Sequence, residues 1–441
     1  MKKGHFFLNL AESLHLIIKP VVFIMNPIMG KSIYININNK MKSKLTVLII
    51  LIFTLASCKS GKKTTKFNSS SKTFGSLQNI VEKNIYRIDK NGKSDSLPIT
   101  IETRMEELNV PGISIAVFDN NKIIWAKGFG IKNKKTQEKV QENTLFQAAS
   151  ISKPVASVTT FKLVEQGKIS LDEDVNLKLE NWKIPENLFT TKEKVTASRI
   201  MSHTSGLGTS GFQGYNRKSS IPSLVQVLEG SEITNSEPVR VIQTPGESEL
   251  YSGGGMEVLQ LLIEDVSGQK FPKLTEKLIF EPLKMKNSSF NYPLPRKLSA
   301  LTSNGYDSNG KVIDGGYHIY PEKAAAGLWT TSSDLAKFMI ALGKSYRGES
   351  GGVLTQSSAI KMLERVPNAG GTGIGIDGKG EAFRFRHSGG NAGFNCYAVS
   401  FANMGRGVVI MTNSDNGFPL NHEIVRAISK TYNWPAMWMR E

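Results

Sequence analysis

Cysteine is scarce in this chain, whose 441 residues include only Cys58 and Cys396. Two cysteines cannot build a disulfide framework, and this pair lacks the spacing of a zinc site. No nucleotide, haem or metal motif is found either, so the sequence predicts a protein that needs no cofactor and no metal ion. Cys396 lies in an alternating, strand-like run, and we expect it to be a buried apolar residue.

The globular part also lacks a basic run interleaved with aromatic residues. The formal net charge is +17, but residues 1–58 carry +6 of it and residues 59–72 another +5, which leaves +6 for the remaining 369 residues. Charge gathered at one end is typical of a leader followed by a solvated tether. The sequence therefore predicts no nucleic-acid partner.

The apolar run from Leu45 to Ala56 has twelve residues. This is too short to span a bilayer as a helix, but it suits the apolar region of a signal peptide. The run follows a basic start at Met41 and closes with Leu55-Ala-Ser-Cys58, which resembles a bacterial lipoprotein signal. The resemblance implies a signal peptide over residues 41–57, with Cys58 lipidated and anchoring the chain to a membrane of the cell envelope, on the periplasmic or outer-membrane side. The alternative is an ordinary signal peptide in which Cys58 is incidental.

Residues 1–40 lie upstream of this complete leader, and Lys19, Pro20 and Pro27 interrupt their apolar stretches. We interpret them as an extension foreign to the native protein, with translation starting at Met41. The alternative is a genuine N-terminal extension. Residues 58–75 are polar without apolar periodicity, and we expect a flexible tether there.

Strand-like runs lie at both ends of the remaining sequence, and helices lie between them. The patterns predict strands at 113–118, 122–129, 383–387, 394–401 and 407–412, and helices at 152–167, 255–267 and 420–432. The fold class that follows is α/β in the α+β sense. The terminal strands pair into an antiparallel sheet flanked by helices, and the inserted segment forms a mostly helical lobe.

Ser150 and Lys153 form the pattern Ser-x-x-Lys at the start of the predicted helix at 152–167. This spacing places an amine one turn from a hydroxyl, on the same face. Serine is a weak nucleophile that needs an adjacent base, and lysine can serve when its pKa is lowered by burial or by nearby positive charge. The helix N-terminus would also favour a developing oxyanion.

The bare pattern is common, because it also begins at Ser60, Ser69, Ser267, Ser308 and Ser358. Taken alone, Ser150 could equally be a helix cap. Ser150 differs from the other serines because it follows a predicted hairpin and opens an apolar helix.

Further motifs follow one another in order along the chain. They are Asn109-Val-Pro-Gly, Phe146 to Pro154, Ser202-His-Thr-Ser-Gly-Leu207, Tyr251-Ser-Gly253, Glu281-Pro-Leu, Ala326-Gly-Leu-Trp and His387-Ser-Gly-Gly390. This series resembles the serine β-lactamase and penicillin-binding-protein family, which includes class C β-lactamases, D,D-peptidases and related esterases. The resemblance implies one β-lactamase-like hydrolase domain over residues 76–435.

The resemblance also assigns roles by position. Ser150 and Lys153 match the family's first motif. Tyr251 matches the tyrosine of the second motif, Tyr-x-Asn, and would relay a proton. His387, Ser388 and Gly389 match the third motif, Lys-Thr-Gly, whose strand binds substrate. The N–H groups of Ser150 and Gly390 would then form the oxyanion hole.

Two positions depart from the family pattern. Gly253 replaces the usual asparagine of the second motif, so a side-chain amide contact to substrate is lost. His387 stands where β-lactamases carry lysine, and a histidine is mostly neutral near pH 7. Both changes argue against efficient β-lactam hydrolysis and are compatible with an esterase or a peptidase.

Four other features are set aside. Ser414-Asp415-Asn416 spells the second motif of class A β-lactamases, but it follows the third motif and indicates a turn. Gly348-x-Ser-x-Gly352 spells a nucleophile elbow, but no strand precedes it and we expect a loop. We interpret His203 as the support of a turn, and Trp329 as either lining the cleft or packing beneath it.

The sequence thus predicts a lipid-anchored serine hydrolase that forms an acyl-enzyme on an amide or ester. The substrate would be a D-amino-acid peptide, a β-lactam or a small ester. The rival interpretation is a penicillin- or peptidoglycan-binding sensor that is acylated and does not turn over.

Replacement of Cys58 by alanine tests the anchor. A single acyl chain binds membranes only marginally, and the lipoprotein pathway places several chains on one cysteine. We expect Cys58→Ala to move the protein from the membrane to the soluble fraction, or to leave it unprocessed, in a fractionation experiment. A soluble wild-type protein with its N-terminus elsewhere would contradict the assignment.

Overall fold

The structure is a computed structural model that describes residues 21–25, 32–36, 71–89, 91–367 and 369–435. The chain divides into two units, Met1–Ser69 and Ser70–Glu441. In the first unit the described residues form an antiparallel hairpin of β1 (Val21–Met25) and β2 (Ser32–Asn36). The predicted signal peptide at 41–57 and Cys58 lie outside the described residues. Among the residues that are described, no helix is long and apolar enough to cross a membrane.

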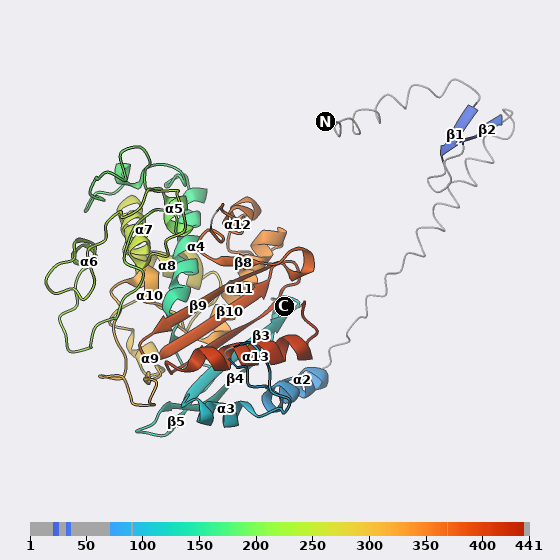
Figure 1. The fold of residues 1–441 in the computed structure, drawn as a ribbon, viewed down its shortest axis with the longest axis horizontal. Coiled ribbons are helices and arrows are strands. Elements are labelled where there is room, and N and C mark those ends of the chain that lie inside the picture. The colour runs from blue at the N-terminus through green and yellow to red at the C-terminus, as the bar shows by residue number, and fades with distance from the viewer. Residues whose placement is uncertain (1–20, 26–31, 37–70, 90, 368, 436–441) are drawn as a thin grey trace. The chain divides into compact units, whose positions relative to one another are not determined.

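A seven-stranded antiparallel sheet is the centre of the second unit (Figure 1). Its order is β5-β4-β3-β11-β10-β9-β8, so strands from the two ends of the domain meet where β3 pairs with β11. This confirms the predicted α+β fold. The strands are β3 (Gly112–Asp119), β4 (Lys122–Asn133), β5 (Glu138–Lys139), β8 (Gly375–Asp377), β9 (Arg384–Asn391), β10 (Phe394–Phe401) and β11 (Arg406–Thr412).

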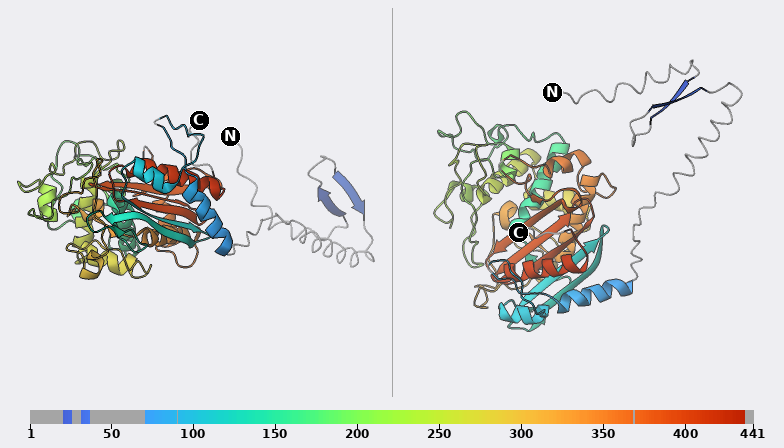
Figure 2. Two further views of the ribbon diagram at one scale, coloured as in Figure 1. Left: turned by 90° about the horizontal axis from the view of Figure 1, so that it is seen from below. Right: turned by 45° about the vertical axis from the view of Figure 1, so that its right-hand side comes forward.

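Three helices cover one face of this sheet: α2 (Ser71–Lys83), α3 (Ile101–Glu107) and α13 (Gly417–Thr431), as Figure 2 shows edge-on. The apolar residues of α13 recur at helical spacing and form one stripe, which faces the strands. Helix α11 (Ser332–Arg347) packs against β3, β10 and β11 on the opposite face.

The inserted segment forms a second, mostly helical lobe around α4 (Ser152–Glu165). Its other elements are η4 (Val175–Leu177), α5 (Ala197–Met201), α6 (Leu224–Glu229), α7 (Gly253–Ser267), α8 (Phe271–Thr275), η5 (Glu276–Phe280), α9 (Arg296–Ser299), α10 (Lys323–Ala326) and α12 (Gln356–Met362). The short strands β6 (Phe146–Gln147) and β7 (Trp329–Thr330) pair beside it, and η6 (Gly380–Ala382) precedes β9.

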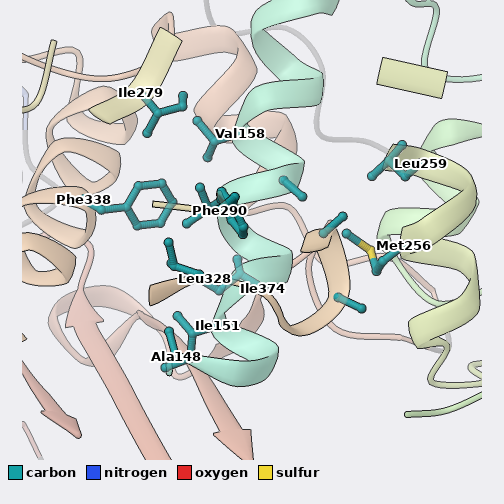
Figure 3. Close-up of a cluster of buried hydrophobic side chains, with 14 of the residues drawn as sticks. Ala148, Ile151, Val158, Met256, Leu259, Ile279, Phe290, Leu328, Phe338 and Ile374 are labelled. Atoms are coloured by element: carbon teal, nitrogen blue, oxygen red, sulfur yellow. The ribbon is translucent and has the colours of Figure 1, made fainter. Parts of the chain in front are cut away.

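Helix α4, which the sequence predicted as an apolar helix, is buried along almost its whole length, including its serine and threonine residues. Apolar side chains from α7, η5 and α11 surround it, and Figure 3 shows Met256, Ile279 and Phe338 among them. Its buried threonines bond back along the helix, as when Thr159 Oγ1 donates to Val155 O at 2.9 Å. These internal bonds let polar residues occupy a helix that is enclosed by core.

A buried ion pair joins α3 to α13 across the sheet face. Arg104 donates from Nε and Nη2 to the two carboxylate oxygens of Glu423, each at 2.8 Å, and the Glu423 side chain is 1% exposed. Glu423 Oε1 also accepts the Ile88 N–H at 3.0 Å. The pair therefore fixes both the helices and the segment that follows α2.

Removal of Arg104 tests this link. Arg104→Ala leaves Glu423 as a buried and unpaired charge, and breaking such a pair costs about 3–5 kcal/mol of unfolding free energy. Thermal or urea unfolding should report this loss, and adding Glu423→Gln should recover part of it. The matched control is Lys361→Ala, which breaks an exposed pair with Glu364 and should change stability by about 0.5 kcal/mol or less. Equal effects at the two sites would contradict the account.

Candidate active site

Ser150 lies where β6 turns into α4, within the short 3-10 turn η3 (Ala149–Ile151). The residue before it, Ala149, has a left-handed backbone with φ +49°. That conformation costs an alanine about 1–2 kcal/mol, and such strain concentrates at functional sites. The Ala148 N–H donates to Leu328 O at 2.8 Å, and this bond fixes the backbone just before the turn.

Lys153 lies one helical turn after Ser150 and points back toward it. Its Nζ donates to Ser150 Oγ at 3.1 Å and to Ala325 O at 2.9 Å, and the residue is 2% exposed. Helix α4 begins at Ser152 without a side-chain cap. The hydroxyl of Ser150 is therefore engaged by the lysine, not by the helix terminus.

Two buried carboxyl groups lie behind Lys153. Glu257 on α7 accepts the Ala325 N–H at 3.1 Å, so Ala325 links Glu257 to Lys153 through its two backbone groups. Burial raises the pKa of Glu257 well above its usual range, and the neighbouring Glu322 raises it further. Burial likewise raises the pKa of Glu322 to about 8. Both shifts favour the neutral carboxylic acid over the carboxylate at these buried positions.

Tyr251 approaches the same point from the loop before α7. Lys153 Nζ lies 5.0 Å from the centre of the Tyr251 ring, and the tyrosine is 38% exposed. His203 packs against that ring, with centroids 4.4 Å apart. Tyr251 thus lies between the buried lysine and the open cleft, which it lines together with Ser150.

Residue 253 is closely packed. A Cβ at this position would lie 2.9 Å from the Phe212 ring and 3.2 Å from Ser210 O. A larger residue would crowd both neighbours, and as a glycine this position offers no side-chain amide to the site. Neighbouring Ser252 caps α7 instead, since its Oγ accepts the Gly255 N–H at 2.7 Å.

Strand β9 forms the opposite wall of the site. A Cβ on Gly389 would lie 2.3 Å from Ala148 O and 3.1 Å from the nitrogen of Ser150. Only glycine allows the strand to pass this close to the turn that holds the serine. The third motif therefore runs directly beside the Ser150 backbone N–H, with Gly390 as the next residue.

His387 lies on β9 with a partly buried side chain. Its Nδ1 is 2.6 Å from Ser388 O. A carbonyl can only accept, so Nδ1 carries a hydrogen and Nε2 is left as an acceptor. Burial and the positive charge of Lys153 lower the pKa of His387 to about 4. The imidazole is therefore neutral near pH 7 and offers a lone pair instead of a cation.

Charged groups occur at the rim of the site. Arg386 lies on β9 and is paired with Asp377 of β8. Glu249 is exposed on the loop two residues before Tyr251. The rim therefore carries an arginine already neutralised by a carboxylate, together with an acidic side chain.

These residues enclose one cleft of about 380 Å³ between β9 and the helical lobe. The structure brings Ser150, Tyr251 and the third motif to its lining, with Lys153 directly behind the serine. The lining residues are Ser150, Met201, Ser202, His203, Glu249, Tyr251, Gly370, Gly371, Gly373, Ile374, Gly375, Arg386, His387, Ser388, Gly389 and Gly390. Among the described residues, no cluster of side chains could hold a metal ion.

The sequence did not identify the parts of the site that come from distant segments. Glu257, Ala325 and the glycine-rich loop 370–375 carry no motif that separates them from ordinary core or loop residues. His203 was interpreted as the support of a turn, and it also lines the cleft. The one signal in the sequence that His203 belongs to the site was its position in an ordered motif that lies between Lys153 and Tyr251.

Apart from His203, the features set aside in the sequence lie outside the cleft. Trp329 is buried against Tyr317 and Phe394, so it packs in the core and does not line the cleft. Gly348 ends α11 with φ +69°. Asp415 lies in the turn before α13, where it accepts the Gly393 N–H at 2.7 Å. Cys396 is fully buried, as predicted.

Comparison with known proteins places this geometry in a family. The sequence model of the Beta-lactamase family matches residues 100–432. Protein flp of Staphylococcus aureus (strain MRSA252) is 23% identical over 339 residues, which cover 74% of this chain and 64% of that protein. Esterase EstB of Burkholderia gladioli is 23% identical over 239 residues, covering 52% of this chain and 60% of that protein. The chain thus spans less than two thirds of the length of these curated relatives.

Solved structures agree with this placement. The octameric penicillin-binding protein homologue from Pyrococcus abyssi has a TM-score of 0.63 and 26% identity, covering 76% of each chain. The penicillin-binding protein from Bacillus halodurans has a TM-score of 0.59 and 21% identity, covering 76% of this chain and 99% of that one. A structure of SurE with D-Leu has a TM-score of 0.59 and 20% identity, covering 75% and 74%. With the same fold, and with a sequence match over most of its length, this chain belongs to the Beta-lactamase family.

Proposed function

We propose that this protein is a serine hydrolase that cleaves amides or esters through an acyl-enzyme. The observation that carries the proposal is the 3.1 Å hydrogen bond between Lys153 Nζ and Ser150 Oγ at the base of a cleft. An amine held against a hydroxyl in this way can activate it as a nucleophile. Membership of a family that includes an esterase relative supports the same reaction class.

The proposed acylation proceeds in two steps. Lys153 must first lose its ammonium proton; Ser150 Oγ then attacks the substrate carbonyl carbon while the hydroxyl proton passes to the lysine amine. The carbonyl oxygen becomes an oxyanion, which the N–H groups of Ser150 and Gly390 stabilise. Tyr251 then delivers a proton to the leaving amine or alcohol, the bond to that group breaks, and the acyl group remains on Ser150.

Deacylation reverses these roles with water as the nucleophile. Water loses a proton to the Lys153–Tyr251 pair and attacks the acyl carbon. The proton returns to Ser150 Oγ as the acid product leaves, so the free enzyme is restored. No cofactor takes part in either half of this cycle.

The cleft favours a substrate without a carboxylate at the position that His387 faces. A neutral imidazole donates no charge-assisted hydrogen bond to a carboxylate, and Arg386 is already paired with Asp377. We therefore rank a small ester, or a D-amino-acid peptide whose terminal carboxylate is esterified or amidated, above a β-lactam. The esterase relative is compatible with this order.

The second candidate function is an acylated sensor that does not turn over. Gly253 is the observation in its favour, because the site lacks the amide of the family's second motif. A sensor would retain the acyl group on Ser150 indefinitely, whereas the hydrolase releases it. In either case we propose that Cys58 anchors the protein to the cell envelope.

Substitution of the nucleophile and its base tests the hydrolase. Ser150→Ala should abolish turnover of a p-nitrophenyl ester, a loss of about 10³-fold or more in kcat, and Lys153→Ala should be almost as inactive. The double variant should be hardly worse than either single one, because the two residues act as one unit. Ser267→Ala and Ser358→Ala are matched controls from the other Ser-x-x-Lys patterns and should retain activity. Full activity in Ser150→Ala would overturn the mechanism.

Replacement of His387 by lysine tests the substrate preference. Because the pKa of His387 is lowered to about 4, the wild-type imidazole stays neutral as pH rises from 6 to 9. The rate at which benzylpenicillin acylates Ser150 should therefore show no dependence on the titration of His387 in that range. His387→Lys supplies a fixed cation and should accelerate this acylation roughly tenfold or more, the worth of a charged hydrogen bond. A neutral ester serves as the control substrate and should respond much less. If the wild-type acylation rate instead changed with pH near 6–7, and this change were lost in His387→Gln, the conclusion that His387 is neutral near pH 7 would be wrong.

A further inference from the structure

His203 occupies a backbone position that normally belongs to glycine. Helix α5 ends at Met201, and the residues after it close a helix-terminating turn with two bonds. His203 N–H donates to Ile200 O at 3.1 Å, and Thr204 N–H donates to Arg199 O at 2.8 Å. This is the Schellman arrangement, whose left-handed residue is usually glycine. His203 holds that place with φ +59°, and a histidine there adopts a conformation that glycine would adopt without strain.

Both backbone amides that flank Tyr251 are bound to this one histidine. Leu250 N–H donates to His203 O at 2.7 Å. Ser252 N–H donates to His203 Nδ1 at 3.2 Å. The backbone on either side of the tyrosine is thus fixed to a single residue of a different loop.

The imidazole ring also contacts the tyrosine ring directly. The two ring centroids lie 4.4 Å apart at an angle of 43°, and His203 is 8% exposed. Burial and the nearby Lys153 and His387 lower the pKa of His203 to about 3. The ring is therefore neutral, and its Nδ1 is available to accept the Ser252 N–H.

We propose that His203 is the positioning residue for Tyr251, holding the phenol in the orientation that proton transfer at Ser150 requires. Its carbonyl oxygen, its Nδ1 and its ring face each make one of the three contacts, with Leu250, Ser252 and Tyr251. The proposal rests on the proposed hydrolase function, since it assigns a role to the tyrosine of that mechanism. It explains why a strained histidine is kept where glycine would serve the turn.

Two substitutions separate this role from support of the turn. His203→Gly keeps the left-handed backbone but removes the ring and the Nδ1 acceptor. His203→Asn also tolerates the left-handed backbone, and its Oδ1 can replace Nδ1 as the acceptor for Ser252 N–H. The matched control is Lys284→Gly, which changes another strained residue, φ +55°, outside the cleft.

Steady-state kinetics with a p-nitrophenyl ester provide the readout. A positioned acid or base contributes roughly 10²–10⁴-fold to rate, so we expect His203→Gly to lose at least roughly tenfold in kcat. KM should remain within about threefold, because the lost interaction acts in the transition state. His203→Asn should recover a large part of that loss, and Lys284→Gly should match the wild type.

A double-mutant cycle with Tyr251→Phe shows whether His203 acts through the tyrosine hydroxyl. In the Tyr251→Phe background, His203→Asn and His203→Gly should cause no further fall in kcat. If His203→Gly folds poorly, His203→Ala, which also removes the ring and its Nδ1 acceptor, carries the same test in the Tyr251→Phe background. Circular dichroism on each variant checks that it is folded.

Several outcomes would overturn the proposal. These are a wild-type kcat in His203→Gly, equal losses in the glycine and asparagine variants, a loss confined to KM, or losses that add fully to that of Tyr251→Phe. Failure of the hydrolase itself is distinguishable, because the wild type would then neither turn over the ester nor be labelled at Ser150 by a fluorophosphonate. A wild type that does both, together with unaffected His203 variants, refutes the positioning role alone.

Discussion

The buried nitrogen of Lys153 is the constraint on which the rest of the site depends. Because the residue is only 2% exposed, the nitrogen must bind acceptors inside the protein, and these are Ser150 Oγ and Ala325 O. Those acceptors must themselves be held in place. Glu257 binds the Ala325 N–H, and Gln260 binds the Ala324 N–H at 3.0 Å, so α7 fixes α10 by two side chains one turn apart. The lysine therefore requires α4, α7 and α10 to pack together as they do.

The cleft also requires the two ends of the domain to meet. Ser150 belongs to the inserted lobe, whereas the third motif lies on β9 of the sheet. Gly389 joins the two, because any side chain there would collide with the turn before Ser150. The sheet in turn depends on β3 and β11, which come from opposite ends of the domain and pair at its centre. The helices that cover its far face are fixed by the buried Arg104–Glu423 pair.

Local patterns predicted the parts of this structure that are encoded over short distances. The hairpin of β3 and β4, the strand β10 and the helix after Ser150 follow from periodicity and from turn residues. The ordered motifs also identified Tyr251 and His387 as candidate site residues, which hydrophobic periodicity alone does not single out. Contacts made across long separations could not be predicted in this way. Examples are the hydrogen bond from Lys153 to Ala325, the burial of α4 on all sides, and the two hydrogen bonds that His203 accepts from the backbone on either side of Tyr251. Such contacts depend on which distant segments of the chain pack together in the fold, and the pattern of a single sequence does not reveal this.

Time-resolved intact mass is the most direct test of the acyl-enzyme mechanism. The wild-type protein is mixed with a slowly hydrolysed ester and with benzylpenicillin, and the adduct is located by peptide mapping. Our account predicts an acyl adduct on the peptide that contains Ser150. With the ester, the adduct should decay to the mass of free enzyme as acid product accumulates. An adduct on any other serine, or product formed by a protein never acylated at Ser150, would contradict it.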